Sequence, residues 1–164
     1  MSLILLADDS PHALRMGEQI LREEGYEVVC AASAADATRW LAAVHPDVVI
    51  ADAYLPGWSG AELCPQVKAA SRHTRVILTA GALETCDEPA ARRMGGDAFL
   101  RKPFEASLVA AVVAPLVREA GLDKYAASPA RNEEIQALVA RAVEEELPRM
   151  VEEITRKVLL ALPR

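Results

Sequence analysis

Five polar residues lie at or just beyond the ends of short apolar stretches of the chain: Asp8, Asp9, Asp52, Thr79 and Lys102. Carboxylates that gather within about 4 to 5 Å repel one another by a few kcal/mol per pair, so they need a counter-charge. A hard divalent cation such as Mg²⁺ accepts carboxylate oxygens, and a lysine supplies a compact positive charge. If the chain brings these residues together, their types predict a Mg²⁺ site that handles phosphoryl groups.

Asp52 is the candidate phosphate acceptor, because it stands alone after the apolar residues 48–51. Its carboxylate would attack phosphorus in line and form an acyl phosphate. Lys102 would offset charge on the phosphoryl oxygens, and the Thr79 hydroxyl would donate a hydrogen bond to one of them. The charge left on Asp52 would then draw Thr79 and its loop inward, which predicts a switch.

The elements that must position these residues alternate along the first 120 positions or so. Apolar stretches typical of strands alternate five times with helical patterns; the predicted strands are residues 3–7, 26–31, 47–51, 75–79 and 98–100, and the predicted helices are residues 12–24, 33–44, 62–70, 90–94 and 105–120. Strands that are apolar throughout are typical of a parallel sheet buried on both faces. The predicted fold class is therefore α/β, a doubly wound five-stranded parallel sheet, whose strand ends would collect the five polar residues at one edge.

Four segments together resemble the receiver domain of two-component response regulators. They are LLADDS at residues 5–10, DVVIADAYLPGWSG at 47–60, VILTAGA at 76–82 and GGDAFLRKPF at 95–104. The resemblance covers residues 1 to about 120 and implies the flavodoxin-like receiver fold, with Mg²⁺ as the cofactor. It also implies that a sensor histidine kinase or a phosphotransfer protein supplies the phosphoryl group to Asp52, and that the domain signals through altered protein-protein contacts rather than as an enzyme.

The resemblance further implies roles for individual residues. Asp9 would bind the metal directly, Asp8 mainly through water, and the backbone carbonyl of Tyr54 would complete the metal site beside Asp52. Phe99 matches the aromatic switch of the family, although the family more often has tyrosine there. Pro103 matches a proline that follows a cis peptide bond and orients Lys102. Tyr54 and Gly81 match positions that tune the loss of phosphate.

Simpler interpretations exist for each of these residues. Asp8 and Asp9 after a strand are also typical of a turn or a helix cap, and Lys102 alone could be a solvated surface charge. A pseudo-receiver that acts as an assembly module without phosphorylation is the alternative function. A flavin- or nucleotide-binding enzyme of similar fold is disfavoured, because no glycine-rich phosphate loop follows the first strand.

The C-terminal part has a different character. We predict a receiver domain over residues 1–121, a linker over 122–131 and an amphipathic helical tail over 132–162, with apolar residues every three or four positions. Pro148 within the tail predicts a kink or two shorter helices. Such a tail can fold back on the receiver, pair with another copy or dock on a partner; self-association and partner docking are favoured over fold-back.

Composition restricts the remaining possibilities. A net charge of −6 disfavours nucleic-acid binding, and apolar runs shorter than about 20 residues predict no membrane span. Three cysteines without a CxxC pair predict free thiols that pack as small hydrophobic residues, and hence a cytoplasmic location.

Overall fold

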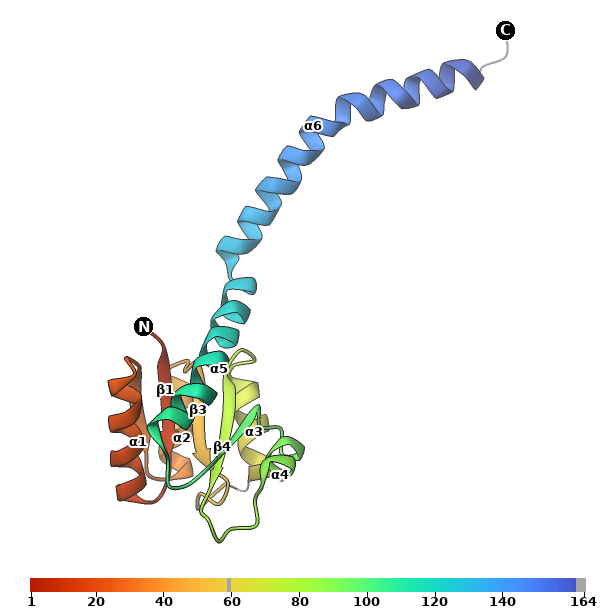
Figure 1. The fold of residues 1–164 in the computed structure, drawn as a ribbon. Coiled ribbons are helices and arrows are strands. Elements are labelled where there is room, and N and C mark those ends of the chain that lie inside the picture. Colours follow the sequence, from red (N-terminus) through yellow and green to blue (C-terminus); the bar gives the residue numbers. More distant parts are fainter. Residues whose placement is uncertain (59, 162–164) are drawn as a thin grey trace. The chain divides into compact units, whose positions relative to one another are not determined.

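The structure is a computed structural model that describes residues 1–58 and 60–161. Five parallel strands alternate with helices, and a long sixth helix follows (Figure 1). The elements are β1 Leu3–Ala7, α1 Pro11–Glu23, β2 Glu27–Ala31, α2 Ala34–Ala43, β3 Val48–Asp52, α3 Gly60–Ala70, β4 Arg75–Ala80, α4 Glu88–Arg93, β5 Ala98–Arg101, α5 Ala106–Ala126 and α6 Pro129–Ala161.

The strand order is β2-β1-β3-β4-β5, and all the paired strands are parallel. The chain begins with β1, adds β2 on one side of it, and then adds β3, β4 and β5 in turn on the other side. The direction of winding therefore reverses between β1 and β3. In sheets of this kind ligands bind beyond the carboxyl ends of the strands at that reversal. The predicted doubly wound sheet is confirmed, and its reversal lies where Asp8, Asp9 and Asp52 follow their strands.

Two apolar layers bury the sheet, because successive strand residues point to opposite faces. Ile4 and Leu6 belong to the layer covered by α1 and α5. Leu5 and Ala7 belong to the layer covered by α2, α3 and α4. Figure 1 shows these helices on the two sides of the sheet. Residues 48–51 are all at most 2% exposed, which explains why β3 is apolar up to Asp52.

Local signals in the sequence fix several helix ends. Ser10 caps α1, since its side chain accepts a hydrogen bond from the backbone N–H of Ala13. Ser33 caps α2 in the same way through the N–H of Asp36. Gly25 follows α1 with a φ of +87°, the left-handed conformation that favours glycine after a helix.

The helical content between residues 121 and 132 is greater than predicted. We expected α5 to end before Gly121 and the tail helix to begin at Asn132, whereas α5 runs to Ala126 and α6 begins at Pro129. Arg75 explains part of the extension, because it pairs with both Glu119 at 3.4 Å and Asp123 at 2.6 Å on α5. The segment predicted as a linker is therefore mostly helical: between α5 and α6 only residues 127 and 128 are not helical.

Ser128 caps α6, because its side chain accepts a hydrogen bond from the N–H of Arg131 at 3.2 Å. Pro129 in the first turn needs no backbone hydrogen-bond partner, which suits a helix start. Pro148 does not divide the tail into two helices, since α6 is one continuous, curved helix through it (Figure 1). The chain forms two compact units, residues 1–123 and 124–164, and the predicted tail end at residue 162 lies outside the described part.

Two further predictions concern cysteines and membranes. Cys64 and Cys86 are buried and Cys30 is half-buried, so two of the three pack as predicted. Burial raises the pKa of both the Cys30 and the Cys64 thiol to about 11, which keeps them protonated near neutral pH. No helix in the described residues has both the length and the apolar character needed to cross a membrane.

Two glycines are expected to respond to alanine with opposite signs. Gly95 has a φ of +93°, and a Cβ there would lie 3.2 Å from the Cβ of Cys64, so G95A should lower the free energy of unfolding by about 1–3 kcal/mol. Gly121 lies inside α5, and a Cβ there would meet open space, so G121A should raise the free energy of unfolding by about 0.5–1 kcal/mol. Urea unfolding of both variants checks the prediction, which fails if the two signs agree.

Candidate functional site

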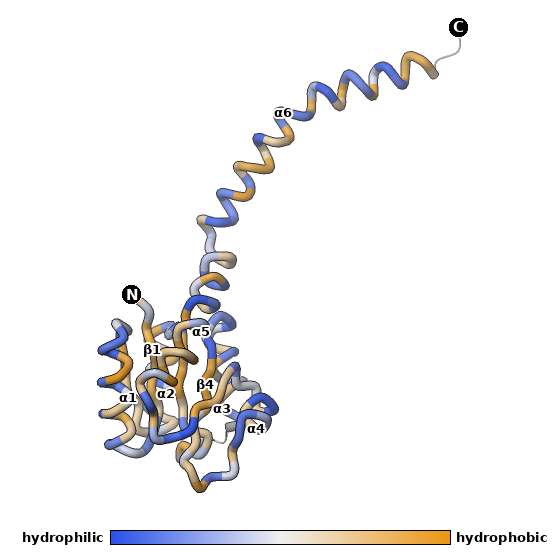
Figure 2. The backbone as a smooth tube through the Cα atoms, viewed as in Figure 1, coloured by the Kyte–Doolittle hydropathy of each residue, from blue (hydrophilic) through white to orange (hydrophobic). Residues whose placement is uncertain are grey.

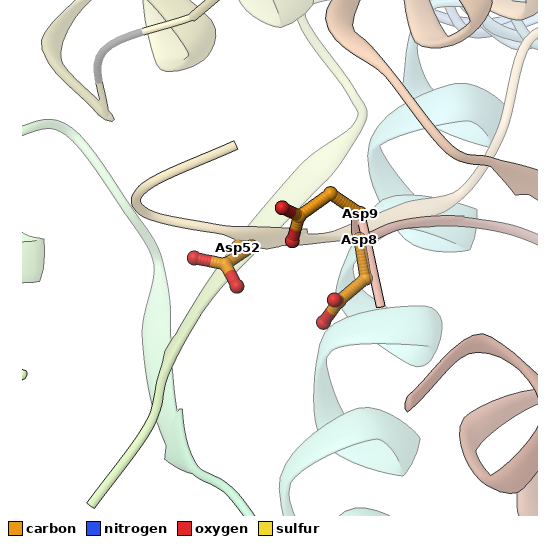
Figure 3. Close-up of side chains that lie close together, drawn as sticks. All are labelled: Asp8, Asp9 and Asp52. Atoms are coloured by element: carbon orange, nitrogen blue, oxygen red, sulfur yellow. The ribbon is translucent and has the colours of Figure 1, made fainter. Parts of the chain in front are cut away.

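Three carboxylates gather where the sheet reverses its winding. Asp8 and Asp9 follow β1, and Asp52 ends β3; each offers an oxygen within 4.8 Å of the others. Figure 3 shows the three side chains close together beyond the strand ends. Asp8 and Asp52 are 1% and 6% exposed, whereas Asp9 is open to solvent. The strand-end argument thus brings the three predicted acids together.

Lys102 contacts both buried carboxylates, although the edge strand that it follows, β5, is not next to β1 or β3 in the sheet. Lys102 Nζ donates hydrogen bonds to Asp8 Oδ2 at 2.7 Å and to Asp52 Oδ2. Burial alone would lower the pKa of Lys102, but the hydrogen bonds and charges of Asp52 and Asp8 outweigh burial and raise it above its usual value. Lys102 is therefore a partly buried counter-ion of two buried carboxylates, which excludes the interpretation as a solvated surface charge.

Backbone N–H groups hold the other oxygen of each buried carboxylate. Asp8 Oδ1 accepts a hydrogen bond from the N–H of Ser10 at 2.9 Å, and Asp52 Oδ1 accepts one from the N–H of Tyr54 at 2.8 Å. Both bonds span two residues, as in turns that aspartate favours. The turn interpretation of Asp8 is thus correct as local structure, and the same turn aims its second oxygen at Lys102.

The remaining predicted site residues lie close to this group along the sheet. Thr79 is buried and stands opposite Asp52 in the register of β3 and β4, and its carbonyl accepts a hydrogen bond from the N–H of Ala53 at 2.9 Å. The peptide bond between Lys102 and Pro103 is cis. The Tyr54 ring is 48% exposed, and its hydroxyl lies 2.9 Å from Oγ1 of Thr85.

Phe99 is half-buried, and a residue that the sequence reasoning missed covers it. The guanidinium of Arg101 lies 5.0 Å from the centre of the Phe99 ring. The same guanidinium donates hydrogen bonds to the carbonyls of Gly81 at 2.8 Å and Glu84 at 3.2 Å. Arg101 thus ties the aromatic residue of β5 to the loop after β4. Its signal in the sequence was a cation two positions after the aromatic residue, on the same face of a strand.

A cavity of about 590 Å³ opens beside Lys102. Its walls come from the start of α1, from the loop after β4 and from the segment after Lys102. Leu83, in that loop, is fully exposed, and Met16 on α1 is 44% exposed. The site therefore has a largely apolar entrance next to its charged centre.

The strand order and the two helical layers define the flavodoxin-like receiver fold. A family model described as the response regulator receiver domain matches residues 4–114. The chain belongs to this family, the receiver domains of two-component systems.

Solved structures agree with this assignment. The chain is similar to a response regulator receiver domain protein from Clostridium thermocellum, with 27% identity and a TM-score of 0.68 over 74% of this chain and 98% of that one. The chain is also similar to a receiver domain of a signal transduction histidine kinase from Syntrophus aciditrophicus, with 29% identity and a TM-score of 0.63 over 72% of this chain and 91% of that one. NtrX from Brucella abortus, in complex with ATP, is 25% identical with a TM-score of 0.69, over 82% of this chain and 33% of its own.

Proposed function

We propose that this protein is a cytoplasmic phosphorylation switch in which Asp52 accepts a phosphoryl group in a Mg²⁺-dependent reaction. The donor is a sensor histidine kinase or a phosphotransfer protein. The observation that carries the proposal is the contact of Lys102 with both Asp8 and Asp52, with Asp9 beside them. An acidic group with one internal cation at the winding reversal of a receiver fold suits a phosphate acceptor rather than an enzyme with a diffusing substrate.

The donor set fits Mg²⁺. Carboxylate oxygens of Asp8, Asp9 and Asp52 lie within 4.8 Å of one another, and hard oxygen ligands are those that Mg²⁺ prefers. The backbone carbonyl of Tyr54 is the candidate fourth protein ligand. When bound, Mg²⁺ would neutralise the carboxylates and the charge that develops on a transferring phosphoryl group.

The residues of this chain would then act as follows. Asp52 attacks phosphorus with the oxygen that now contacts Lys102, while the bond between phosphorus and the donor breaks and its electron pair leaves with the donor atom. The Lys102 ammonium moves its hydrogen bond from the carboxylate to a phosphoryl oxygen. Thr79, opposite Asp52 on β4, supplies a hydroxyl hydrogen bond to another oxygen. The N–H of Tyr54 keeps the carboxylate in place through its second oxygen.

The signal would leave the site through the loop after β4. A shift of Thr79 toward the phosphoryl group pulls on Gly81, whose carbonyl is bound by Arg101. Arg101 in turn covers Phe99, so the loop and the aromatic ring would respond together. The output is a change in which surfaces the receiver offers to other proteins.

Acetyl phosphate tests the proposal without knowledge of the donor. With Mg²⁺ present, we expect the chain to gain the mass of one phosphoryl group, in a linkage that is stable in acid and broken by base, as acyl phosphates are. Chelation of Mg²⁺ should prevent the gain. A folded chain that gains no phosphate over a range of donor and Mg²⁺ concentrations would contradict the proposal and favour the phosphorylation-independent assembly module.

A further inference from the structure

The C-terminal half of α6 carries an apolar stripe. Its members recur at steps of three and four, apart from the adjacent Met150 and Val151, and are each 52–57% exposed: Val143, Leu147, Met150, Val151, Ile154 and Val158. Figure 2 shows apolar bands recurring along this helix, and α6 has no buried residue within the described part. A stripe of this length in water favours association over isolation.

A row of alternating charges borders the stripe. Glu146, Arg149, Glu153 and Lys157 follow one another at steps of three, four and four, so they lie on one face of the helix. The structure records two contacts within the row: Arg149 Nη1 lies 3.9 Å from Glu146, and Lys157 Nζ lies 2.7 Å from Glu153. Glu146 and Glu153 stand four residues before and three residues after Met150, which places the row beside the stripe.

Both features are symmetric about nearly the same point of the helix. Read in the reverse direction about the bond between Met150 and Val151, Val143 exchanges with Val158 and Leu147 with Ile154, so apolar residues fall on apolar residues. Arg149 and Glu153 are equidistant from Val151, and Glu146 and Lys157 are equidistant from the bond between Val151 and Glu152, so the two charge pairs are centred half a residue and one residue beyond the centre of the stripe. In a reversed copy each charge of the row therefore lies within about one residue of an opposite charge.

We propose that this segment of α6, residues 143–158, pairs in antiparallel orientation with the same segment of a second copy of the chain. In an antiparallel pair related by a two-fold axis, equal flanks of the two helices face each other, so the charge row meets its own reverse. Sixteen helical residues span about 24 Å, which gives a continuous seam. The two stripes bury each other, and the rows set direction and register.

A parallel pair in register would lose the charge complementarity. The row of one helix would then face the opposite flank of the other, which consists of Glu144, Pro148, Glu152 and Thr155. Both charges of that flank are negative, so Glu146 and Glu153 would find no opposite charge there. If the partner were a different protein, nothing about the pairing would require the charge row to be complementary to its own reverse. These observations favour a second copy over the other possible occupants of the stripe.

Complementary charge variants of the full chain test the pairing. R149E/K157E makes the row entirely acidic, and E146K/E153K makes it entirely basic. Each variant alone should dimerise at least about tenfold more weakly than the wild type, because four attractive contacts across the pair become repulsive. An equimolar mixture of the two should recover a pair of wild-type strength. R131E/R141E is the matched control for R149E/K157E, because it makes the same change in net charge outside the segment, and it should dimerise as the wild type does.

Sedimentation equilibrium at low salt, without phosphodonor, gives the readout, because exposed ion pairs are screened at high salt. Circular dichroism checks that each variant keeps its helix. If the wild type has the mass of one chain throughout the micromolar range, the proposal is overturned, because that mass is expected if the stripe folds back on the receiver or binds a different protein. Row variants that dimerise as tightly as the control, or a mixture without recovery, would overturn the antiparallel register. Neither result depends on phosphorylation of Asp52.

Discussion

Replacement of Asp52 with asparagine is expected to lower phosphoryl uptake from acetyl phosphate by at least about a hundredfold, because an amide oxygen is a poor nucleophile. The amide oxygen can still accept the hydrogen bond from the N–H of Tyr54, so the turn after β3 should survive. The stoichiometry of the acid-stable, base-labile adduct, measured by intact mass, checks this prediction. Unfolding curves of the variant should remain cooperative.

Asp87→Asn serves as the matched control. Asp87 caps α4 through a hydrogen bond from the N–H of Ala90, and asparagine caps helices equally well. D87N removes the same charge outside the carboxylate group, so its phosphoryl uptake should equal that of the wild type. If D52N were phosphorylated to the same extent as D87N, another side chain would be the acceptor.

The sheet and the site could be predicted because both follow from short-range rules. A strand buried on both faces is expected to be apolar, as residues 48–51 of β3 are, so the place of β3 in the sequence is plain. Once the strands are parallel, their carboxyl ends share one edge, and residues as distant in sequence as Asp8, Asp52 and Lys102 must meet there. The separate hydrogen bonds of the two carboxylate oxygens, to backbone and to lysine, could not be predicted, because they depend on side-chain rotamers.

The helix ends after residue 120 show where such rules fail. A glycine inside a helix costs only about 1 kcal/mol, so Gly121 marks an end only where no tertiary contact favours continuation. Here Arg75, from the first position of β4, pairs with Glu119 and Asp123 on either side of that glycine. The partners are more than 40 residues apart in sequence, and no local pattern reveals them. The role of Arg101 was missed in part because it depends on the carbonyls of the loop after β4, although its place two residues after Phe99 was visible in the sequence.

Removal of the Lys102 charge is expected to destabilise the metal-free protein. Asp8 and Asp52 are buried and share this one ammonium, so K102A leaves two neighbouring carboxylates without it. The free energy of unfolding should fall by roughly 3 kcal/mol, the lower end of the range for breaking a buried ion pair. The lower end applies because the Lys102 side chain is 18% exposed to solvent. Most domains have more stability than this, so the variant should still fold.

The pH of the measurement follows from the pKa of Lys102. Because this pKa is raised in the folded state, the ion pairs stabilise the fold fully below the ordinary value of 10.5 and lose their effect only as pH rises through the higher folded-state value. Urea unfolding at pH 7 without metal therefore detects the whole contribution. K102M, of similar length but uncharged, should lose about as much as K102A if charge rather than packing is the cause.

Mg²⁺ separates the two roles of Lys102. The carboxylates without their internal cation should bind Mg²⁺ more tightly than in the wild type, so added Mg²⁺ should raise the stability of K102A by more than it raises that of the wild type. Mg²⁺ cannot replace the hydrogen bond of the Lys102 ammonium to a phosphoryl oxygen. With Mg²⁺ present, phosphorylation of K102A should therefore still change partner binding less than phosphorylation of the wild type does. Equal stabilisation of both proteins by Mg²⁺ would mean that Lys102 does not neutralise the acids, and an undiminished response would remove it from the switch.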